Sequence, residues 1–501
     1  MCRIVPPRPS LSFDDPGEVA RLRHVLRDAG YTPGGIEALA GADLTALGQR
    51  SVAVLLRRTA GGSPLETLVR LFMAGVAVPR EMLERSVGTA HVARWASWGL
   101  LAAGAGEVRA TVQLGCHGEL LLATDWGPAT PSAGTPPDYV MGFSPSTLTL
   151  ARMTVRRPSP SALDVGSGSG LQALLAAAHC ERVVATDLNP RAVRVSRFNA
   201  ALNEMDERVQ CVEGDMFAPV AGQRFELVVS NPPFVVAPPG AHMFMSGAGG
   251  ALDGVCAGIA RSAPRHLAAG GWCQFLANWA VVRGQDWRER LASWFGDSAC
   301  DVWVIRRERQ PADEYAALWI ETERDDAAEY SARFDDWMRW YDAHGVEAVD
   351  YGLVTMRRRG DESAGRLRCD DVRGAWDSAD GDDVAAAFAR HDWLESTGDA
   401  ALLDACLRVS DDARLGRELV AVRGEWVPVS ARLRVDGGID DAGGIDPHGE
   451  RIVAACDGRT PLRALLQDLA DTLAAPLDAV APDALRAVRA LVERGILLAP
   501  G

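Results

Sequence analysis

The sequence predicts an α/β protein in which a mostly parallel sheet carries the functional site, with an α+β module before the sheet and a mostly helical module after it. Three observations predict the sheet. A glycine loop follows a short apolar strand, a second apolar strand ends in a carboxylate, and the apolar run 225–230 ends in Asn231-Pro232-Pro233-Phe234. Because these strands alternate with helical patterns, they are expected to be neighbouring units of one parallel sheet.

The glycine loop has the sequence Asp-Val-Gly-Ser-Gly-Ser-Gly and spans residues 164–170. Apolar residues precede it at 162–165, as in a buried strand, and leucines and alanines recur at helical spacing over 171–178. Glycines permit positive φ and a close approach of the backbone to a ligand, while the helix N-terminus offers free N–H groups. The pattern predicts a cofactor pocket whose candidate contacts are Asp164, Gly166, Ser167, Gly168 and Gly170.

The next two strands add polar residues for the same pocket. The apolar run 183–186 ends in Asp187, roughly 20 residues beyond the loop, where an acid that binds ribose hydroxyls is expected. The following strand, 209–212, leads to Asp215, which can accept from an adenine amino group, and to Met216, which can pack against the ring. These strands contribute four further candidate contacts, Asp187, Leu188, Asp215 and Met216.

The tetrapeptide 231–234 suits the methylation of a planar amino nitrogen. The lone pair of an amide or nucleobase NH2 is delocalised and must be localised before it can attack a methyl group. The Asn231 side-chain oxygen and the Pro232 carbonyl can each accept one N–H and stabilise positive charge developing on nitrogen. Pro232 and Pro233 fix φ and lack N–H donors, and Phe234 offers a face for stacking. All four residues are therefore candidate catalytic residues.

From Tyr139 to Arg359 the chain resembles the class I S-adenosylmethionine-dependent methyltransferases, through these motifs in order. The resemblance implies a Rossmann-like sheet of seven strands and S-adenosylmethionine as cofactor, with Asn231 also near the cofactor. Methyltransferases of this class that act on amino nitrogens carry an Asn/Asp-Pro-Pro-aromatic sequence, and the tetrapeptide is similar to it. The chain also resembles the release-factor glutamine N5-methyltransferases of the small-methyltransferase family, through a glycine turn at 249–254.

Two departures leave the acceptor open. Residues 142–150 lack the Arg/Thr/Glu pattern of the bacterial release-factor enzymes, and Phe234 replaces their usual tyrosine, whereas ribosomal-RNA guanine and adenine N-methyltransferases often have phenylalanine there. The preferred acceptor is a glutamine amide of a protein. The alternative is a base of rRNA, tRNA or DNA, at adenine N6 or guanine N2, and a third reading is a noncatalytic cofactor-binding scaffold.

Composition and charge indicate which ligands and which cellular location are expected. A net charge of -15 disfavours sequence-independent binding to a phosphate backbone, although arginines cluster at 152–157 and 357–359. The 10 cysteines are scattered without a histidine cluster, so no metal site is expected. His242, the histidine nearest the tetrapeptide, is interpreted as a loop residue. No apolar stretch is long enough to span a membrane, and a cytoplasmic protein is expected.

Three domains are predicted. Residues 1–135 form a winged-helix-like module, with helices at 44–56 and 65–72, another helix starting at 78–81, and an alternating strand at 108–112. A Pro/Ser/Thr/Gly linker at 128–137 leads to the methyltransferase domain, 136–359. Residues 360–501 are expected to form an acidic, poorly structured linker over 370–383 and a small helical or winged-helix-like docking module.

The rest of the central domain is predicted from its apolar runs. A helix over 255–267 leads to a strand at 272–276, and further strands are expected at 300–305 and 351–356. A long insertion, 311–345, lies between the last two strands. It places Phe334, Trp337, Trp340 and Tyr341 at helical spacing, which predicts a core-facing stripe or, if the stripe is exposed, a substrate lid.

Overall fold

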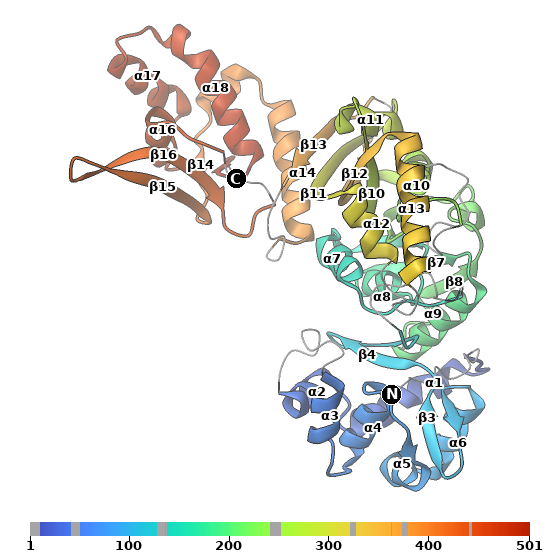
Figure 1. Ribbon diagram of the computed structural model, residues 1–501. Coiled ribbons are helices and arrows are strands. Elements are labelled where there is room, and N and C mark those ends of the chain that lie inside the picture. Colours follow the sequence, from blue (N-terminus) through green and yellow to red (C-terminus); the bar gives the residue numbers. More distant parts are fainter. Residues whose placement is uncertain are drawn as a thin grey trace. The chain divides into compact units, whose positions relative to one another are not determined.

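A computed structural model describes residues 11–41, 51–127, 136, 138–240, 252–320, 327–361, 363–372, 379–439 and 443–500 (Figure 1). The chain divides into two compact units, one made of residues 1–151 and 157–370 and the other of residues 152–156 and 371–501. Four sequence predictions fall wholly or largely outside the described residues, namely the 128–137 linker, the start of the 44–56 helix, the turn at 249–254 and His242.

The first unit is built on a sheet of eight strands among the described residues. The strands are β6 (Ser159–Val165), β7 (Cys180–Asp187), β8 (Val209–Glu213), β9 (Phe225–Ser230), β10 (Leu267–Val282), β11 (Cys300–Pro311), β12 (Val346–Arg358) and β13 (Leu367–Asp371). Their order is β13-β11-β12-β10-β9-β6-β7-β8. The five strands from β10 to β8 are parallel, and β12 is antiparallel to both β10 and β11. The predicted α/β fold with a mostly parallel sheet is confirmed, and β13 adds an edge strand to the predicted seven.

The register of the central strands places their carboxyl ends at the same edge of the sheet. Val165 pairs with Thr186 on one side and with Ser230 on the other. The residues that follow, Gly166 and Asn231, therefore leave the sheet at the same edge as Asp187, the last residue of β7. Strand order reverses at β6, and ligands bind in open α/β sheets at such a reversal.

The antiparallel strands are longer than the sequence predicts. β10 has 16 residues and pairs with β12 from Trp272 to Val282, whereas the apolar pattern identified only 272–276. The small residues Ala277 and Ala280 and the polar Asn278 weaken that pattern, although they are buried. Their burial depends on helices contributed by distant parts of the chain, which a local pattern does not reveal.

Seven helices flank the described part of this sheet. They are α7 (Pro145–Met153), α8 (Leu171–Ala177), α9 (Pro190–Leu202), α10 (Gly254–His266), α11 (Trp287–Phe295), α12 (Ala312–Ile320) and α13 (Ala327–His344). The predicted insertion thus forms α12 and α13. Trp337 and Tyr341 of α13 are buried in a core with Val235 and Val236, so these two members of the aromatic stripe pack inward as the core interpretation predicts.

The N-terminal part belongs to the same unit as the sheet. Its helices are α1 (Pro16–Asp28), α2 (Pro33–Ala40), α3 (Ser51–Arg58), α4 (Pro64–Phe72), α5 (Arg80–Val87) and α6 (Thr89–Ser97). Its strands are β1 (Val78–Pro79), β2 (Leu101–Ala103), β3 (Glu107–Ala110), β4 (Gln113–His117) and β5 (Leu120–Thr124). β1, β3 and β2 form a small antiparallel sheet, and the winged-helix interpretation stays a prediction. The hydrophobic core of this part continues into α9 through Phe198, which contacts the rings of Phe13 and Trp98.

Two asparagines one turn apart join α9 to β5. Asn199 accepts from the Ala123 N–H (2.7 Å) and donates to the Ala123 carbonyl (3.0 Å). Asn203 repeats the pattern with Leu121, at 3.0 and 2.7 Å. Asn199 also donates to the Ser169 carbonyl at 2.8 Å, which links this set of hydrogen bonds between α9 and β5 to the glycine loop. The N-terminal part therefore braces the helix and the loop that border the predicted cofactor site.

The second unit is a helical module with a long hairpin. Its elements are α14 (Gly381–Ser396), α15 (Asp399–Asp404), β14 (Arg408–Val409), β15 (Ala413–Val422), β16 (Glu425–Val435), α16 (Pro447–Ala455), α17 (Leu462–Thr472), α18 (Leu477–Glu493) and β17 (Leu497–Leu498). The predicted acidic linker is wrong at both ends. β13 extends to Asp371 in the sheet, while Asp380 and Asp383 form a capping box that starts α14. Acidic side chains there satisfy helix N–H groups rather than mark disorder.

The described helices are either too short or too polar to cross a lipid bilayer.

Candidate active site

A cavity of about 880 Å³ opens at the carboxyl edge of the parallel strands. Nearly all of the predicted cofactor and catalytic residues line it. They are Asp164, Gly166, Ser167, Gly168, Asp187, Leu188, Asp215, Met216, Asn231, Pro232, Pro233 and Phe234. The exception is Gly170, which faces α9: a Cβ added there would lie 2.4 Å from the Ser196 hydroxyl. Its role in this structure is close packing of the loop against a helix.

The glycine loop has the geometry of a ligand cradle. Gly166 and Gly168 adopt φ of 70° and 55°, and a Cβ at either position would have no heavy atom within 4 Å. The free space at both glycines therefore lies on the cavity side. Between them, the Ser167 hydroxyl is buried and has no hydrogen-bond partner among the described residues. Backbone and hydroxyl groups here are available to a bound molecule.

Asp187 is fixed at the end of β7 by two backbone donors. One carboxylate oxygen accepts from the Gly168 N–H and the other from the Asn189 N–H, each at 2.8 Å. Burial raises the pKa of Asp187, and these two N–H groups oppose the rise. The carboxylate thus holds the glycine loop while its remaining lone pairs face the cavity, as a ribose-binding acid requires.

Asp164 is the deeper acid of the pair. It is 1% exposed, and one of its oxygens accepts from the Ala173 N–H at 3.0 Å. Burial raises the pKa of Asp164 to about 7, and the charge of Asp187 adds to the rise. Two carboxylates close together in a buried site favour a cationic ligand, because a positive charge would stabilise both in the ionised form.

The third strand leads to the predicted adenine site. Asp215 is exposed and lines the cavity beside Met216. Met216 has a φ of 45°, uncommon for a residue with a side chain, and its carbonyl accepts from the Thr186 hydroxyl at 2.9 Å. Leu188, on the neighbouring strand end, is 60% exposed although it is apolar. Leu188 and Met216 together offer an apolar surface for a planar ring.

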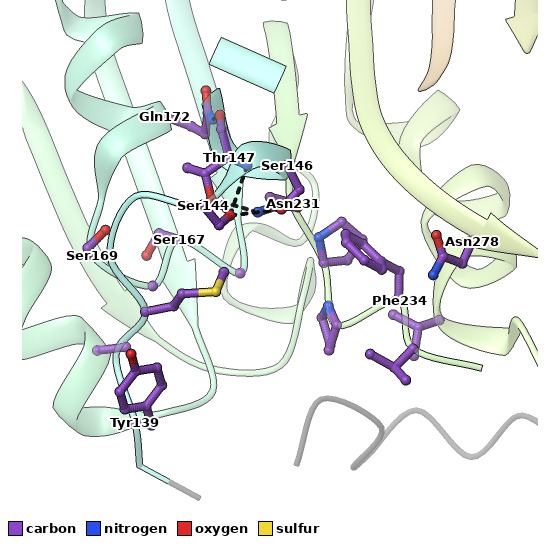
Figure 2. Close-up of a pocket in the computed structure, with 18 of the residues that line it drawn as sticks. Tyr139, Ser144, Ser146, Thr147, Ser167, Ser169, Gln172, Asn231, Phe234 and Asn278 are labelled. Carbon is purple, nitrogen blue, oxygen red and sulfur yellow. Dashed lines mark hydrogen bonds between the residues drawn. The ribbon is translucent and has the colours of Figure 1, made fainter. Parts of the chain in front are cut away.

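The tetrapeptide is held by a residue that the sequence did not identify as functional. The Asn231 side-chain amide donates to the Thr147 hydroxyl at 3.1 Å, from 84 residues away (Figure 2). Asn231 Oδ1 is buried and has no hydrogen-bond partner among the described residues. One N–H of Nδ2 is bonded to Thr147, whereas Oδ1 is the amide atom without a partner among the described residues and can accept from a ligand.

Thr147 is in turn fixed by its neighbours at the start of α7. Its hydroxyl is 2.7 Å from the Ser144 hydroxyl, its N–H donates to Ser144 at 3.1 Å, and its carbonyl accepts from Gln172 at 2.9 Å. Ser144 followed by Pro145 is a pattern typical of a helix start, and it could have located α7 from the sequence. That signal locates the helix, but its contact with Asn231 arises only from the tertiary fold.

The far wall of the cavity comes from the insertion and the antiparallel strands. The Phe234 ring lies 6.1 Å from the ring of Tyr351 on β12, at 61°. Tyr315, Leu318 and Trp319 of α12 line the same wall. The aromatic stripe of α13 packs in the core, so the exposed stripe on which the lid hypothesis depended is not observed.

The arginine clusters are engaged within the fold. Arg357 and Arg359 pair with Asp301 at 3.0 and 2.7 Å. Arg157 and Arg357 both lie over the ring of Trp272, at 5.8 and 5.7 Å from its centroid. Arg157, Arg357 and Arg359 therefore each have a partner within the fold.

Replacement of Asp187 is expected to weaken cofactor binding first. Asp187→Ala removes a charged acceptor and frees the Gly168 N–H, so the Kd for S-adenosylmethionine should rise roughly 10- to 100-fold. Titration calorimetry measures the change. The exposed acid Asp206, which lies outside the cavity, provides the matched control Asp206→Ala. An unchanged Kd in Asp187→Ala would remove this carboxylate from the site.

Comparison with known proteins finds one family of known activity that part of the chain resembles. Residues 144–298 match the family Methyltransferase small domain. Residues 28–111 and 385–499 match two families described as Domain of unknown function (DUF7059) and Domain of unknown function (DUF7782). The described cavity residues before residue 144 and after residue 298 therefore lie outside the methyltransferase match.

Two curated relatives are similar to the central part of the chain. The release factor glutamine methyltransferase of Cereibacter sphaeroides is 36% identical over 140 residues, which cover 25% of this chain and 50% of that protein. The ribosomal protein uL3 glutamine methyltransferase of Bradyrhizobium diazoefficiens is 38% identical over 120 residues, or 22% and 38% of the two chains. The chain thus spans half of the length of these relatives or less.

A solved structure, a methyltransferase from Pyrococcus furiosus, is 15% identical to this chain. That match covers 47% of this chain and 89% of the other, with a TM-score of 0.28. The family match and the curated relatives confirm the predicted class, a S-adenosylmethionine-dependent methyltransferase, for this stretch of the chain.

Proposed function

We propose that this chain, whose residues 144–298 match the family Methyltransferase small domain, transfers a methyl group from S-adenosylmethionine to the side-chain amide nitrogen of a glutamine in a protein. The observation that carries the proposal is the orphaned oxygen of Asn231. A buried acceptor without a partner costs about 1–3 kcal/mol, and an N–H donor from a substrate removes that cost. Asn231 Oδ1 is therefore more stable when it accepts from a substrate NH2 group than when it has no partner.

The cavity residues fit the cofactor. Gly166 and Gly168 leave open space beside the backbone, and the Ser167 hydroxyl lacks a partner among the described residues. Asp187 would hold the ribose, Asp215 and Met216 the adenine, and Asp164 would counter the positive charge of the amino-acid tail. When bound, the cofactor supplies a methyl group on a sulfonium, so that the N–C bond forms as the S–C bond breaks and its electron pair stays on sulfur.

The chain's own residues prepare the nitrogen. Asn231 Oδ1 and the Pro232 carbonyl each accept one N–H, which holds the NH2 group with its lone pair directed away from both oxygens. The positive charge that develops on nitrogen is stabilised by the same two oxygens. The hydrogen bond from the Asn231 amide to Thr147 favours the orientation in which Oδ1 is left for the substrate. The extra proton leaves the strongly acidic product to solvent, so no separate base is needed.

Three features favour a protein glutamine over a nucleic-acid base. The two curated relatives are named as glutamine methyltransferases. The net charge of -15 opposes a polyanionic substrate. In addition, Arg357 and Arg359, which a nucleic-acid surface would need free, are paired with Asp301.

Radiolabelled S-adenosylmethionine tests the proposal. The purified protein is incubated with the label and a bacterial lysate, which is then treated with ribonuclease, deoxyribonuclease or protease. Label that survives both nucleases and is lost to protease, followed by detection of N5-methylglutamine in the digest, is the expected result. Label lost to a nuclease and resistant to protease would replace the glutamine by a base.

A further inference from the structure

A second buried amide faces the same cavity. Asn278 of β10 is 3% exposed and lines the cavity together with Asn231 and Phe234. Its Nδ2 donates to the Tyr315 hydroxyl at 2.7 Å, while its Oδ1 has no hydrogen-bond partner among the described residues. Figure 2 shows Asn231 and Asn278 on opposite sides of the Phe234 ring. The cavity therefore holds two orphaned amide oxygens, and the transfer reaction uses only the first.

The insertion holds Asn278 in this orientation. Tyr315 of α12 accepts from Asn278 and also from the Val236 N–H, at 3.2 Å. Tyr341 of α13 donates to the Val236 carbonyl at 2.7 Å. The two tyrosines thus bind both backbone groups of Val236, two residues beyond Phe234. The insertion therefore fixes both the segment that follows the tetrapeptide and the side-chain amide of Asn278.

Asn278 Oδ1 can accept a hydrogen bond from an N–H group of the substrate. A glutamine amide has two N–H groups, and Asn231 and Pro232 take both. The next donors in the acceptor are main-chain N–H groups, which a peptide supplies along its length. Beside its amino group adenine presents only ring nitrogens that accept, so adenine would leave Asn278 unpaired. Guanine, with a ring N–H beside its amino group, is the base that meets the same requirement.

We propose that Asn278 Oδ1 accepts a main-chain N–H of the peptide that carries the methylated glutamine, an inference that rests on the proposed function. Asn278 is then an acceptor-binding residue that positions the peptide across Phe234, and the 311–345 insertion supports it through Tyr315. The expected signature is a change in acceptor affinity with little change in the rate of transfer once the acceptor is bound.

Kinetics with a protein acceptor test this residue. With unmethylated bacterial release factor as substrate, Asn278→Leu should raise KM roughly 5- to 50-fold while kcat changes much less. Calorimetry should show S-adenosylmethionine binding unchanged. The matched control is Gln274→Leu, four residues earlier on β10, where a buried amide pairs with Thr355 outside the cavity. Its KM should stay at the wild-type value, and an equal rise in both variants would overturn the proposal.

Peptides with altered backbones supply a second test, and its first comparison uses the wild-type protein alone. A glycine-flanked pentapeptide with a central glutamine is compared with analogues in which one amide at a time is replaced by an ester. One ester should weaken binding to the wild-type protein, and Asn278→Leu should show no further loss with that analogue. If no ester weakens binding, the main-chain contact is refuted while methylation of the parent peptide still upholds the proposed function.

Failure of the proposed function would give a different set of assay results. No methylation of the release factor or the pentapeptide by the wild-type protein would reject the glutamine acceptor itself. Binding of a guanine-containing oligonucleotide that Asn278→Leu weakens would then reassign the second amide to a base and overturn the peptide contact.

Discussion

Asn231→Ala should abolish most methyl transfer and leave cofactor binding nearly intact. The variant removes the oxygen that accepts the substrate N–H and stabilises charge developing on nitrogen, and loss of one such group typically lowers kcat by ~10²–10³-fold. Initial rates with labelled cofactor measure the loss, and calorimetry measures the Kd of S-adenosylmethionine. Transfer and cofactor affinity that fall together would contradict the catalytic role of Asn231.

Loss of the Thr147 hydroxyl is expected to lower kcat less than Asn231→Ala does. Thr147→Val keeps the shape of the side chain but removes the oxygen that accepts from the Asn231 amide. The amide can then turn its NH2 end toward the substrate, and a loss of roughly 10-fold in kcat is expected from a hydrogen bond of this kind. Thr147→Ser retains the oxygen and should stay close to wild type. Equal losses in the valine and serine variants would point to packing rather than to amide orientation.

Local patterns in the sequence located most of the cofactor side of the cavity. The strand, glycine loop and helix around 164–178 follow one another without a break, and Asp187 ends the next apolar run. In a parallel sheet such strand ends meet at one edge, so their order along the chain implies their proximity. The structure places these residues on the cavity wall, apart from Gly170, which packs on Ser196.

The acceptor side could not be predicted in the same way. Thr147 reaches Asn231 across 84 residues, and Asn278 depends on Tyr315, 37 residues further along the chain. Neither pair leaves a periodic trace, because the two partners lie in separate segments that only the tertiary fold brings together. The same holds for Asn199 and Asn203, whose backbone partners in β5 lie 76 and 82 residues away. Burial and pairing of polar groups are tertiary facts that no local sequence pattern shows.

Asp164→Asn is expected to stabilise the cofactor-free protein at pH 8 and to have little effect at pH 4. Burial raises the pKa of Asp164 from 3.8 to about 7 in the folded protein. In the unfolded chain this carboxyl ionises near its ordinary pKa, whereas in the fold it stays protonated until about pH 7. Its contribution to the free energy of unfolding therefore falls as pH rises from about 4 to about 7 and is constant above that. A rise of this size corresponds to at most ~4 kcal/mol.

Asparagine removes the ionisation and still accepts from the Ala173 N–H, so the stability gained should appear only where the wild-type carboxyl would be forced to ionise. Urea unfolding of both proteins at pH 4 and pH 8, without cofactor, measures it; a gain of the same size at both values would refute the titration argument. The gain should come at the expense of binding. S-adenosylmethionine is cationic and stabilises an ionised carboxyl, so wild-type affinity should rise between pH 6 and pH 8 while the variant binds more weakly and without that slope. If both results are obtained, Asp164 lowers the stability of the cofactor-free protein and supplies negative charge for the bound cofactor.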